Sequence, residues 1–114
     1  MEFSDTLRSE LDYFDNYIMP PIKDEDYRLA AIELDECVTI LRGLIDSEPH
    51  IWPSIRAYVN DLVDKMDLLK TFCEMGCTIH VDSLVEELYD KMPNYRTMVG
   101  DLVESDDYTI DSQL

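Results

Sequence analysis

The sequence has few glycines and prolines, which interrupt helices, few cysteines, which form disulfides, and few basic residues to balance its acidic ones. Its 114 residues include three glycines, five prolines and three cysteines, and nine basic residues oppose 26 acidic ones, for a net charge of −17. The glycines are isolated, which excludes a glycine-rich loop for phosphate binding. The cysteines show no framework spacing, which argues against a disulfide-stapled domain and favours a reducing, cytoplasmic compartment.

The sequence also has no long apolar run, and its N-terminal residues do not show a basic region followed by an apolar run. No stretch approaches the roughly 20 apolar residues that a membrane-spanning helix needs, so we expect an intracellular chain without a membrane segment. The shortage of positive charge argues against direct binding of nucleic acid, because a negative field repels phosphates and attracts basic proteins. We therefore expect the partner to present a basic protein surface.

Apolar residues make up 46% of the chain and recur at the three- and four-residue intervals of helices. We expect a first helix at about 4–17, ended by Pro20 and Pro21 because proline disfavours helix in the residue before it. A second should run from Asp24, as N-cap, to about residue 47, and a third from Pro53 to about Gly76. The inward rows are Leu7, Leu11, Phe14 and Ile18; Tyr27, Ala30, Ala31, Leu34, Cys37, Val38, Leu41, Leu44 and Ile45; and Ile55, Tyr58, Val59, Leu62, Met66, Leu69 and Cys73.

The remaining third of the chain gives a weaker pattern. Residues 77–81 look extended, and Ser83 with Glu86 forms a capping-box pattern for a fourth helix to about Met92. A fifth helix is expected after Pro93. Residues 105–114 should form a flexible acidic tail, with pairing of 108–110 against 78–81 as a two-strand patch the alternative.

These elements predict the fold class and the domain organisation. We expect an all-α protein, a small antiparallel bundle of four to five helices, with the two-strand patch as its only β-structure. Residues 1–104 should form one helical domain, and residues 105–114 the tail.

The acidic residues are distributed unevenly. Residues 1–48 hold 13 acids and four bases, residues 49–80 hold four and three, and residues 81–114 hold nine and two. The acidity therefore belongs to the first two helices and the C-terminal third, and the sequence leaves open whether these regions meet. The acidic and adjoining residues predicted to bind a partner are Asp5, Asp12, Asp15, Glu25, Glu36, Asp106, Asp107 and Tyr108.

A second apolar row on the second helix also needs a partner. Leu29, Ile32 and Ile40 project opposite the main row. Two apolar faces mean that the helix is either packed on both sides within the bundle or used in association. We favour the packed helix, with a partner or homodimer interface as the alternative.

Cys73, Cys77 and His80 form the only local cluster with metal-ligand character. Their spacing is not that of a zinc knuckle, and Cys73 falls in the apolar row of its helix, so we favour packing over metal binding. No pair of residues stands out as catalytic, and we expect neither a metal nor a cofactor.

The charge and the helical pattern together predict a non-catalytic protein-binding module. In its most concrete form it is a stoichiometric inhibitor that occupies the basic site of a nucleic-acid-handling enzyme, its carboxylates standing where phosphates would sit. The alternative is a scaffold or adaptor subunit that associates through apolar helix faces.

Overall fold

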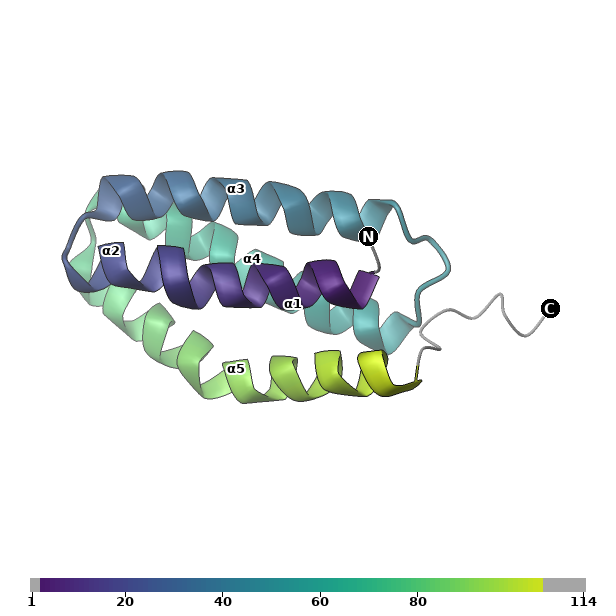
Figure 1. Ribbon diagram of the computed structural model, residues 1–114. Coiled ribbons are helices and arrows are strands. Elements are labelled where there is room, and N and C mark those ends of the chain that lie inside the picture. Colours follow the sequence, from purple (N-terminus) through teal and green to yellow (C-terminus); the bar gives the residue numbers. More distant parts are fainter. Residues whose placement is uncertain (1–2, 106–114) are drawn as a thin grey trace.

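The computed structural model describes residues 3–105, which form an antiparallel bundle of four helical arms (Figure 1). The first arm consists of α1 (Phe3–Tyr13), η1 (Phe14–Ile18) and α2 (Met19–Lys23). It contacts α3 (Tyr27–Asp46) and α5 (Thr78–Ser105), and α4 (Pro53–Met75) contacts the same two helices, so the arms form a closed square with four interfaces. No β-strand element and no helix long and apolar enough to cross a membrane occur within residues 3–105. The all-α class and the bundle are confirmed.

The first arm continues beyond its expected end. α1 (Phe3–Tyr13), a π-helical turn η1 (Phe14–Ile18) and α2 (Met19–Lys23) follow one another in helical geometry, so the predicted stop at Pro20 and Pro21 is wrong. A proline lacks the N–H of an α-helical bond, and its ring clashes with the carbonyl four residues earlier. The wider π turn, in which the Met19 N–H bonds the Phe14 carbonyl, places both prolines in the first turn of α2, where neither problem arises.

The two middle helices match the sequence pattern closely. α3 (Tyr27–Asp46) is capped by Asp26, whose side chain accepts the Leu29 N–H at 3.3 Å, so the cap lies two residues after the expected Asp24. α4 (Pro53–Met75) begins at Pro53 as predicted. It ends at Gly76, whose φ of 68° is the left-handed conformation that glycine adopts most easily.

The last arm is one helix, α5 (Thr78–Ser105), instead of an extended run and two helices. The Val81 N–H bonds the Cys77 carbonyl at 2.9 Å, which makes the expected extended segment the first helical turn. Ser83 and Glu86 lie inside the helix and are exposed, so they do not start it. Figure 1 shows α5 bending midway, as expected of a helix that contains a proline, here Pro93.

The helical start of α5 also removes the two-strand patch, since residues 78–81 are not available as a strand. Its other half, 108–110, lies outside the described residues. The same is true of the predicted tail apart from Ser105, which ends α5.

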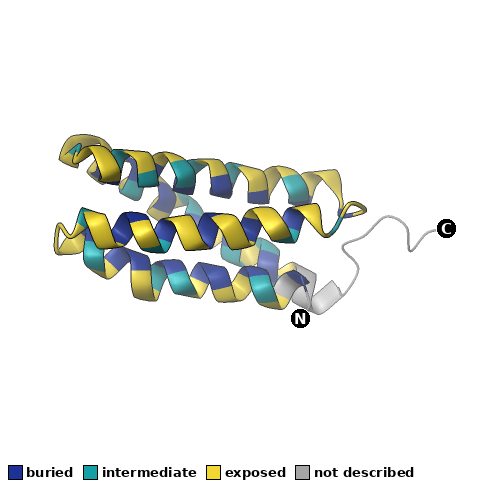
Figure 2. Ribbon diagram, turned by 90° about the horizontal axis from the view of Figure 1, so that it is seen from above, coloured by how far each residue is buried: buried dark blue, intermediate teal, exposed yellow. Residues whose placement is uncertain are grey.

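The core is built from the rows that the sequence predicts, and Figure 2 shows buried and exposed positions alternating along the helices. All members of the first row are buried, and so are those of the third except Tyr58, which is 49% exposed. Tyr58 instead packs edge-on against Tyr95, with ring centroids 6.3 Å apart. In α5 one buried row runs through Pro93: Val81, Leu84, Leu88, Met92, Tyr95 and Val99.

Candidate functional site

Ion pairs between helices occur at three of the four interfaces of the bundle. Arg42 and Lys70 link α3 to α4 through Asp67 and Asp35, at 3.3 and 2.9 Å. Lys65 and Lys91 link α4 to α5, and Arg96 links α5 to the first arm. Among the described residues no ion pair joins α1 to α3, so the interface between these two helices is the one without a compensating cation.

At the α1–α5 interface two acidic residues share one cation. The Arg96 guanidinium pairs with Asp12 at 3.0 Å and also with Asp15. The structure therefore brings these two predicted residues together, but around an internal cation. Arg96 occupies one oxygen of each carboxylate, so both offer less to a basic surface than an unpaired carboxylate does.

At the α4–α5 interface Asp61 is the centre of a network. It accepts hydrogen bonds from Lys65 at 2.7 Å, from the Tyr95 hydroxyl at 2.7 Å and from Lys91 at 3.5 Å. The bond from Lys65 and the bond from Tyr95 lower the pKa of Asp61 below its ordinary value. This carboxylate is satisfied within the fold.

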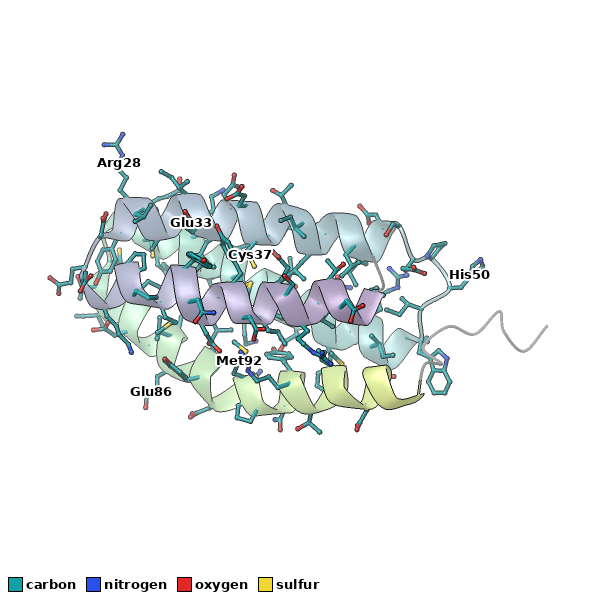
Figure 3. All side chains as sticks on the ribbon, in the orientation of Figure 1. Arg28, Glu33, Cys37, His50, Glu86 and Met92 are labelled. Atoms are coloured by element: carbon teal, nitrogen blue, oxygen red, sulfur yellow. The ribbon has the colours of Figure 1, made fainter. Side chains whose placement is uncertain are left out.

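The α1–α3 interface carries carboxylates instead. The Tyr13 hydroxyl of α1 hydrogen-bonds Glu33 Oε2 of α3 and lies 3.3 Å from Glu36 Oε2. Glu10, one turn before Tyr13, lies at the same interface, where its main-chain carbonyl accepts from the Cys37 thiol at 3.9 Å. Figure 3 shows Glu33 and Cys37 on the side of α3 that faces α1. We call Glu10, Glu33, Glu36 and Tyr13 the α1–α3 acidic cluster.

Glu10 is the buried member of this cluster. It is only 7% exposed, and its Oε1 atom has no hydrogen-bond partner in the part of the chain that the structure describes. Burial raises the pKa of the Glu10 carboxyl above its ordinary value of 4.5, the Cys37 thiol lowers it, and the nearby charge of Glu36 raises it further. A polar atom without a partner in a core is costly and calls for an explanation.

The second apolar row of α3 is exposed. Leu29 is 41%, Ile32 58% and Ile40 43% exposed, so the favoured prediction that α3 packs on both sides within the bundle is wrong. These residues, with Glu36 between Ile32 and Ile40, form what we call the outer face of α3. Glu36 therefore belongs both to this face and to the acidic cluster.

The other predicted binding residues are scattered. Asp5 is exposed on α1, and Glu25 is exposed in the turn between α2 and α3, where it adopts a φ of 60°. Neither makes a contact that marks it as a site. Asp106, Asp107 and Tyr108 lie outside the described residues.

Cys73 and His80, two members of the predicted cysteine and histidine cluster, pack against other residues. Cys73 is buried, and burial raises the pKa of its thiol to about 11. The His80 ring stacks on Phe72, with centroids 4.9 Å apart. Within residues 3–105 no group of three or more histidine, cysteine or acidic side chains is arranged to hold a metal ion.

Sequence reasoning missed Glu10, Tyr13 and Glu33. The signal for Glu10 was available: it stands within the row Phe3, Leu7, Glu10 and Phe14, where spacing puts a charged residue on the buried side of the helix. The contacts of Tyr13 with Glu33 and Glu36 cross about 20 residues of sequence, and no local pattern marks them.

Comparison with known proteins adds no family to this description. No protein family model matches the chain, and neither a curated protein nor a solved structure resembles it significantly.

Proposed function

We propose that this protein is a non-catalytic, acidic protein-binding module that occupies a basic, nucleic-acid-binding site on a partner protein. The observation that supports the proposal is the α1–α3 acidic cluster, which makes no ion pair with a cation of residues 3–105, while the other three interfaces each contain one. Carboxylates on rigid helices present fixed negative charges, and arginine pairs with carboxylates and phosphates through the same forked geometry. The protein would thereby act as a stoichiometric inhibitor.

The binding residues proposed from the sequence change in one respect. We give Glu33 beside Glu36 precedence over Asp12 and Asp15, because Arg96 already pairs with both of the latter. Asp5, Glu25, Asp106, Asp107 and Tyr108 stay predictions at the edge of this surface.

A second candidate function is an adaptor subunit that associates through apolar contacts. It is favoured by the exposure of Leu29, Ile32 and Ile40, and by a hollow of about 460 Å³ between α3 and α4 whose lining includes Ile32, Arg28 and Glu74. An adaptor of this kind would keep its affinity as salt rises, since apolar contacts are not screened.

The test is competition for a purified partner obtained by affinity capture. The wild-type protein should displace nucleic acid from that partner at a ratio of one to one. The double variant Glu33→Gln/Glu36→Gln should bind at least about tenfold more weakly, because a hydrogen bond to a charged group contributes about 1.5–3 kcal/mol. Asp82→Asn/Glu86→Gln is the matched control, since it removes two exposed charges four residues apart on α5.

Two results would overturn phosphate mimicry. One is a partner that binds nucleic acid and this protein at the same time. The other is an affinity that stays constant while salt rises and falls on substitution of Ile32 and Ile40 by serine, because that pattern belongs to the adaptor.

A further inference from the structure

The outer face of α3 presents an apolar row to solvent, with one charge in its middle. Leu29, Ile32, Glu36 and Ile40 follow one another at intervals of three or four residues, which puts them on one side of the helix. The apolar members are all exposed, Ile32 the most at 58%. Single exposed apolar residues are ordinary on a soluble protein, but a row of them along about 16 Å of one helix is a surface that a partner covers.

A groove beside this row offers space for a partner's side chain. The hollow of about 460 Å³ between α3 and α4 adjoins a second hollow of about 310 Å³, because Ala31, Ile32 and Glu74 line both. The lining includes the buried residues Ala31 and Cys73, so the inner side of the groove is apolar. Grooves of this kind bind amphipathic helices, which anchor themselves through side chains three, four or seven residues apart.

The charges around the row are balanced on one side only. Toward α4, Asp35 and Arg42 each take part in an ion pair with that helix. In the row itself Glu36 is exposed and makes no ion pair within residues 3–105, and toward α1 the same is true of Glu33. The unbalanced negative charge therefore lies at the centre of the row and along its α1 side. A partner that covers the row must supply a cation there, because a carboxylate that loses water without gaining a partner is costly.

We propose that the outer face of α3 binds a basic amphipathic helix of the partner protein. Apolar side chains of that helix lie on Ile32 and Ile40 and reach into the groove, and a lysine or arginine one turn from each of them pairs with Glu36. Further basic residues lie along the flank that faces α1. The inference rests on the proposed function and names the element of the partner that this protein recognises.

Two other occupants carry the wrong charge. A second copy could place its own α3 antiparallel on this face, with Ile32 of each copy near Ile40 of the other. Glu36 stands midway between these two residues, so it would meet Glu36 of the other copy, and each chain brings a net charge of −17. Residues 106–114 of the chain itself contain three acids and no base, so the same carboxylates repel them.

The experiment titrates four labelled peptides of about 20 residues, long enough to form helices, into the full chain at low salt and follows binding by fluorescence anisotropy. The basic probe is alanine-rich and has leucines four residues before and after a central arginine, with lysines along one flank. The scrambled probe has the same composition in an order that gives no apolar row. The swapped probe has glutamate in place of the central arginine. The α3 probe consists of residues 27–46 and represents a second copy.

The basic probe should bind saturably and shift the amide resonances of Ile32, Glu36 and Ile40 in the isotope-labelled chain. The scrambled probe should bind at least about tenfold more weakly, because it keeps the charge but cannot cover both isoleucines at once. The swapped probe should bind at least about threefold more weakly, the amount expected from one exposed ion pair. The α3 probe should show no saturable binding.

Variants separate the row from the general negative field. Ile32→Ser/Ile40→Ser should weaken binding of the basic probe at least about tenfold. The matched control Leu68→Ser/Ile79→Ser removes two exposed apolar side chains that line neither hollow, and should leave binding within about twofold. Glu36→Arg should reverse the preference, so that the swapped probe binds more tightly than the basic probe. All five positions are exposed, so these substitutions leave the core intact.

The inference would be overturned if the control variant weakened binding as much as Ile32→Ser/Ile40→Ser, or if Glu36→Arg left the preference unchanged. It would also be overturned if the scrambled probe bound as tightly as the basic probe, since binding would then need charge alone. Saturable binding of the α3 probe would overturn it too, because the face would then be a dimer interface.

These failures are distinct from failure of the proposed function. Binding of the basic probe at the row, by a protein that displaces no nucleic acid from its partner, would remove the inhibitor and keep the inference. Displacement of nucleic acid that Ile32→Ser/Ile40→Ser does not weaken would keep the inhibitor and remove the inference.

Discussion

Replacing Glu10 by glutamine should stabilise the protein at neutral pH. The substitution keeps the size of the side chain and removes the charge that burial disfavours. In the wild type the folded pKa of Glu10 lies above its ordinary value of 4.5 because of burial and the charge of Glu36. The folded state therefore holds the proton more tightly than the unfolded chain does. Stability from this group is complete below the unfolded pKa and is lost as the pH rises through the folded one.

The size of the effect follows from the environment of Oε1. Glutamine also places a polar atom at the position of Oε1, in a side chain only 7% exposed, so the gain comes from removing the charge and not the polar atom. Each unit by which burial raises a pKa corresponds to about 1.4 kcal/mol at a pH above both pKa values, and we expect Glu10→Gln to raise the free energy of unfolding by about 1 kcal/mol at pH 7. For a domain of this size each kcal/mol corresponds to about 4–8 °C in Tm. At pH 4 both side chains are neutral, so the difference should nearly vanish.

The assay is urea unfolding of both proteins from pH 4 to pH 8, followed by circular dichroism. Any neutralised carboxylate relieves some repulsion in a chain of charge −17, so the control is Glu86→Gln, an exposed residue of α5. Equal gains from both substitutions at pH 7 would refute the reasoning. A gain for Glu10→Gln that did not change with pH would also refute it, because the effect would then not be electrostatic.

Three further predictions concern parts of the fold outside the α1–α3 acidic cluster. Gly76→Ala should lower the free energy of unfolding by about 1 kcal/mol, because alanine is strained at the φ of 68°. Gly43→Ala, inside α3, should raise it by up to about 1 kcal/mol, because alanine favours helix. An added Cβ meets nothing at either position, so equal effects of the two substitutions in chemical denaturation would contradict an explanation from the backbone. Tyr95→Phe should cost about 1 kcal/mol by removing the 2.7 Å bond to Asp61, and an unchanged midpoint in urea would show that this bond contributes nothing. A thiol reagent should modify Cys77 first in the native protein, with Cys37 and Cys73 modified only on unfolding, because the last two are buried; simultaneous modification, read by mass spectrometry, would mean that the core opens locally.

The sequence predicted those parts of the fold in which a row of apolar residues determines which side of a helix is buried. The buried rows of α1, α3 and α4 follow the spacing of their residues, and the left-handed Gly76 ends α4 as expected. Two of the errors, the early end of the first helix and the break in α5 at Pro93, came from giving proline more weight than the row that crosses it. Ile18 and Ile22 continue the first row across Pro20 and Pro21, and Met92 and Tyr95 continue the last row across Pro93.

The reason is energetic. Proline inside a helix costs about 3 kcal/mol, while full burial of each large apolar side chain returns about 1.5–3 kcal/mol. A row with several buried residues beyond the proline therefore outweighs it. At Pro20 the cost is smaller, because the π turn places this proline in the first turn of α2. Sequence patterns contain the rows but give no sign of the π turn.

The candidate site was less predictable than the fold. Exposure of acidic residues can be read from helical periodicity, and Asp12 and Glu36 are exposed as expected. Whether an exposed carboxylate is free depends on cations from distant parts of the chain. Arg96 reaches Asp12 across 84 residues, and no local pattern could show it. The choice between a neutralised and a free carboxylate is therefore a property of the tertiary structure.

The exposed apolar residues and the acidic cluster converge on Glu36, and this convergence bears on the choice between inhibitor and adaptor. Glu36 lies between Ile32 and Ile40 on the outer face of α3 and is also within reach of the Tyr13 hydroxyl. A partner that covers one surface must therefore cover part of the other, burying apolar area together with paired charge. Salt screens only the second contribution. A pure phosphate mimic loses nearly all of its affinity at high salt, and a pure adaptor loses none. The affinity of a partner for this shared surface should instead fall with rising salt until it reaches a plateau. Glu33 and Glu36 set how steeply the affinity falls, and Ile32 and Ile40 set the affinity that remains at the plateau.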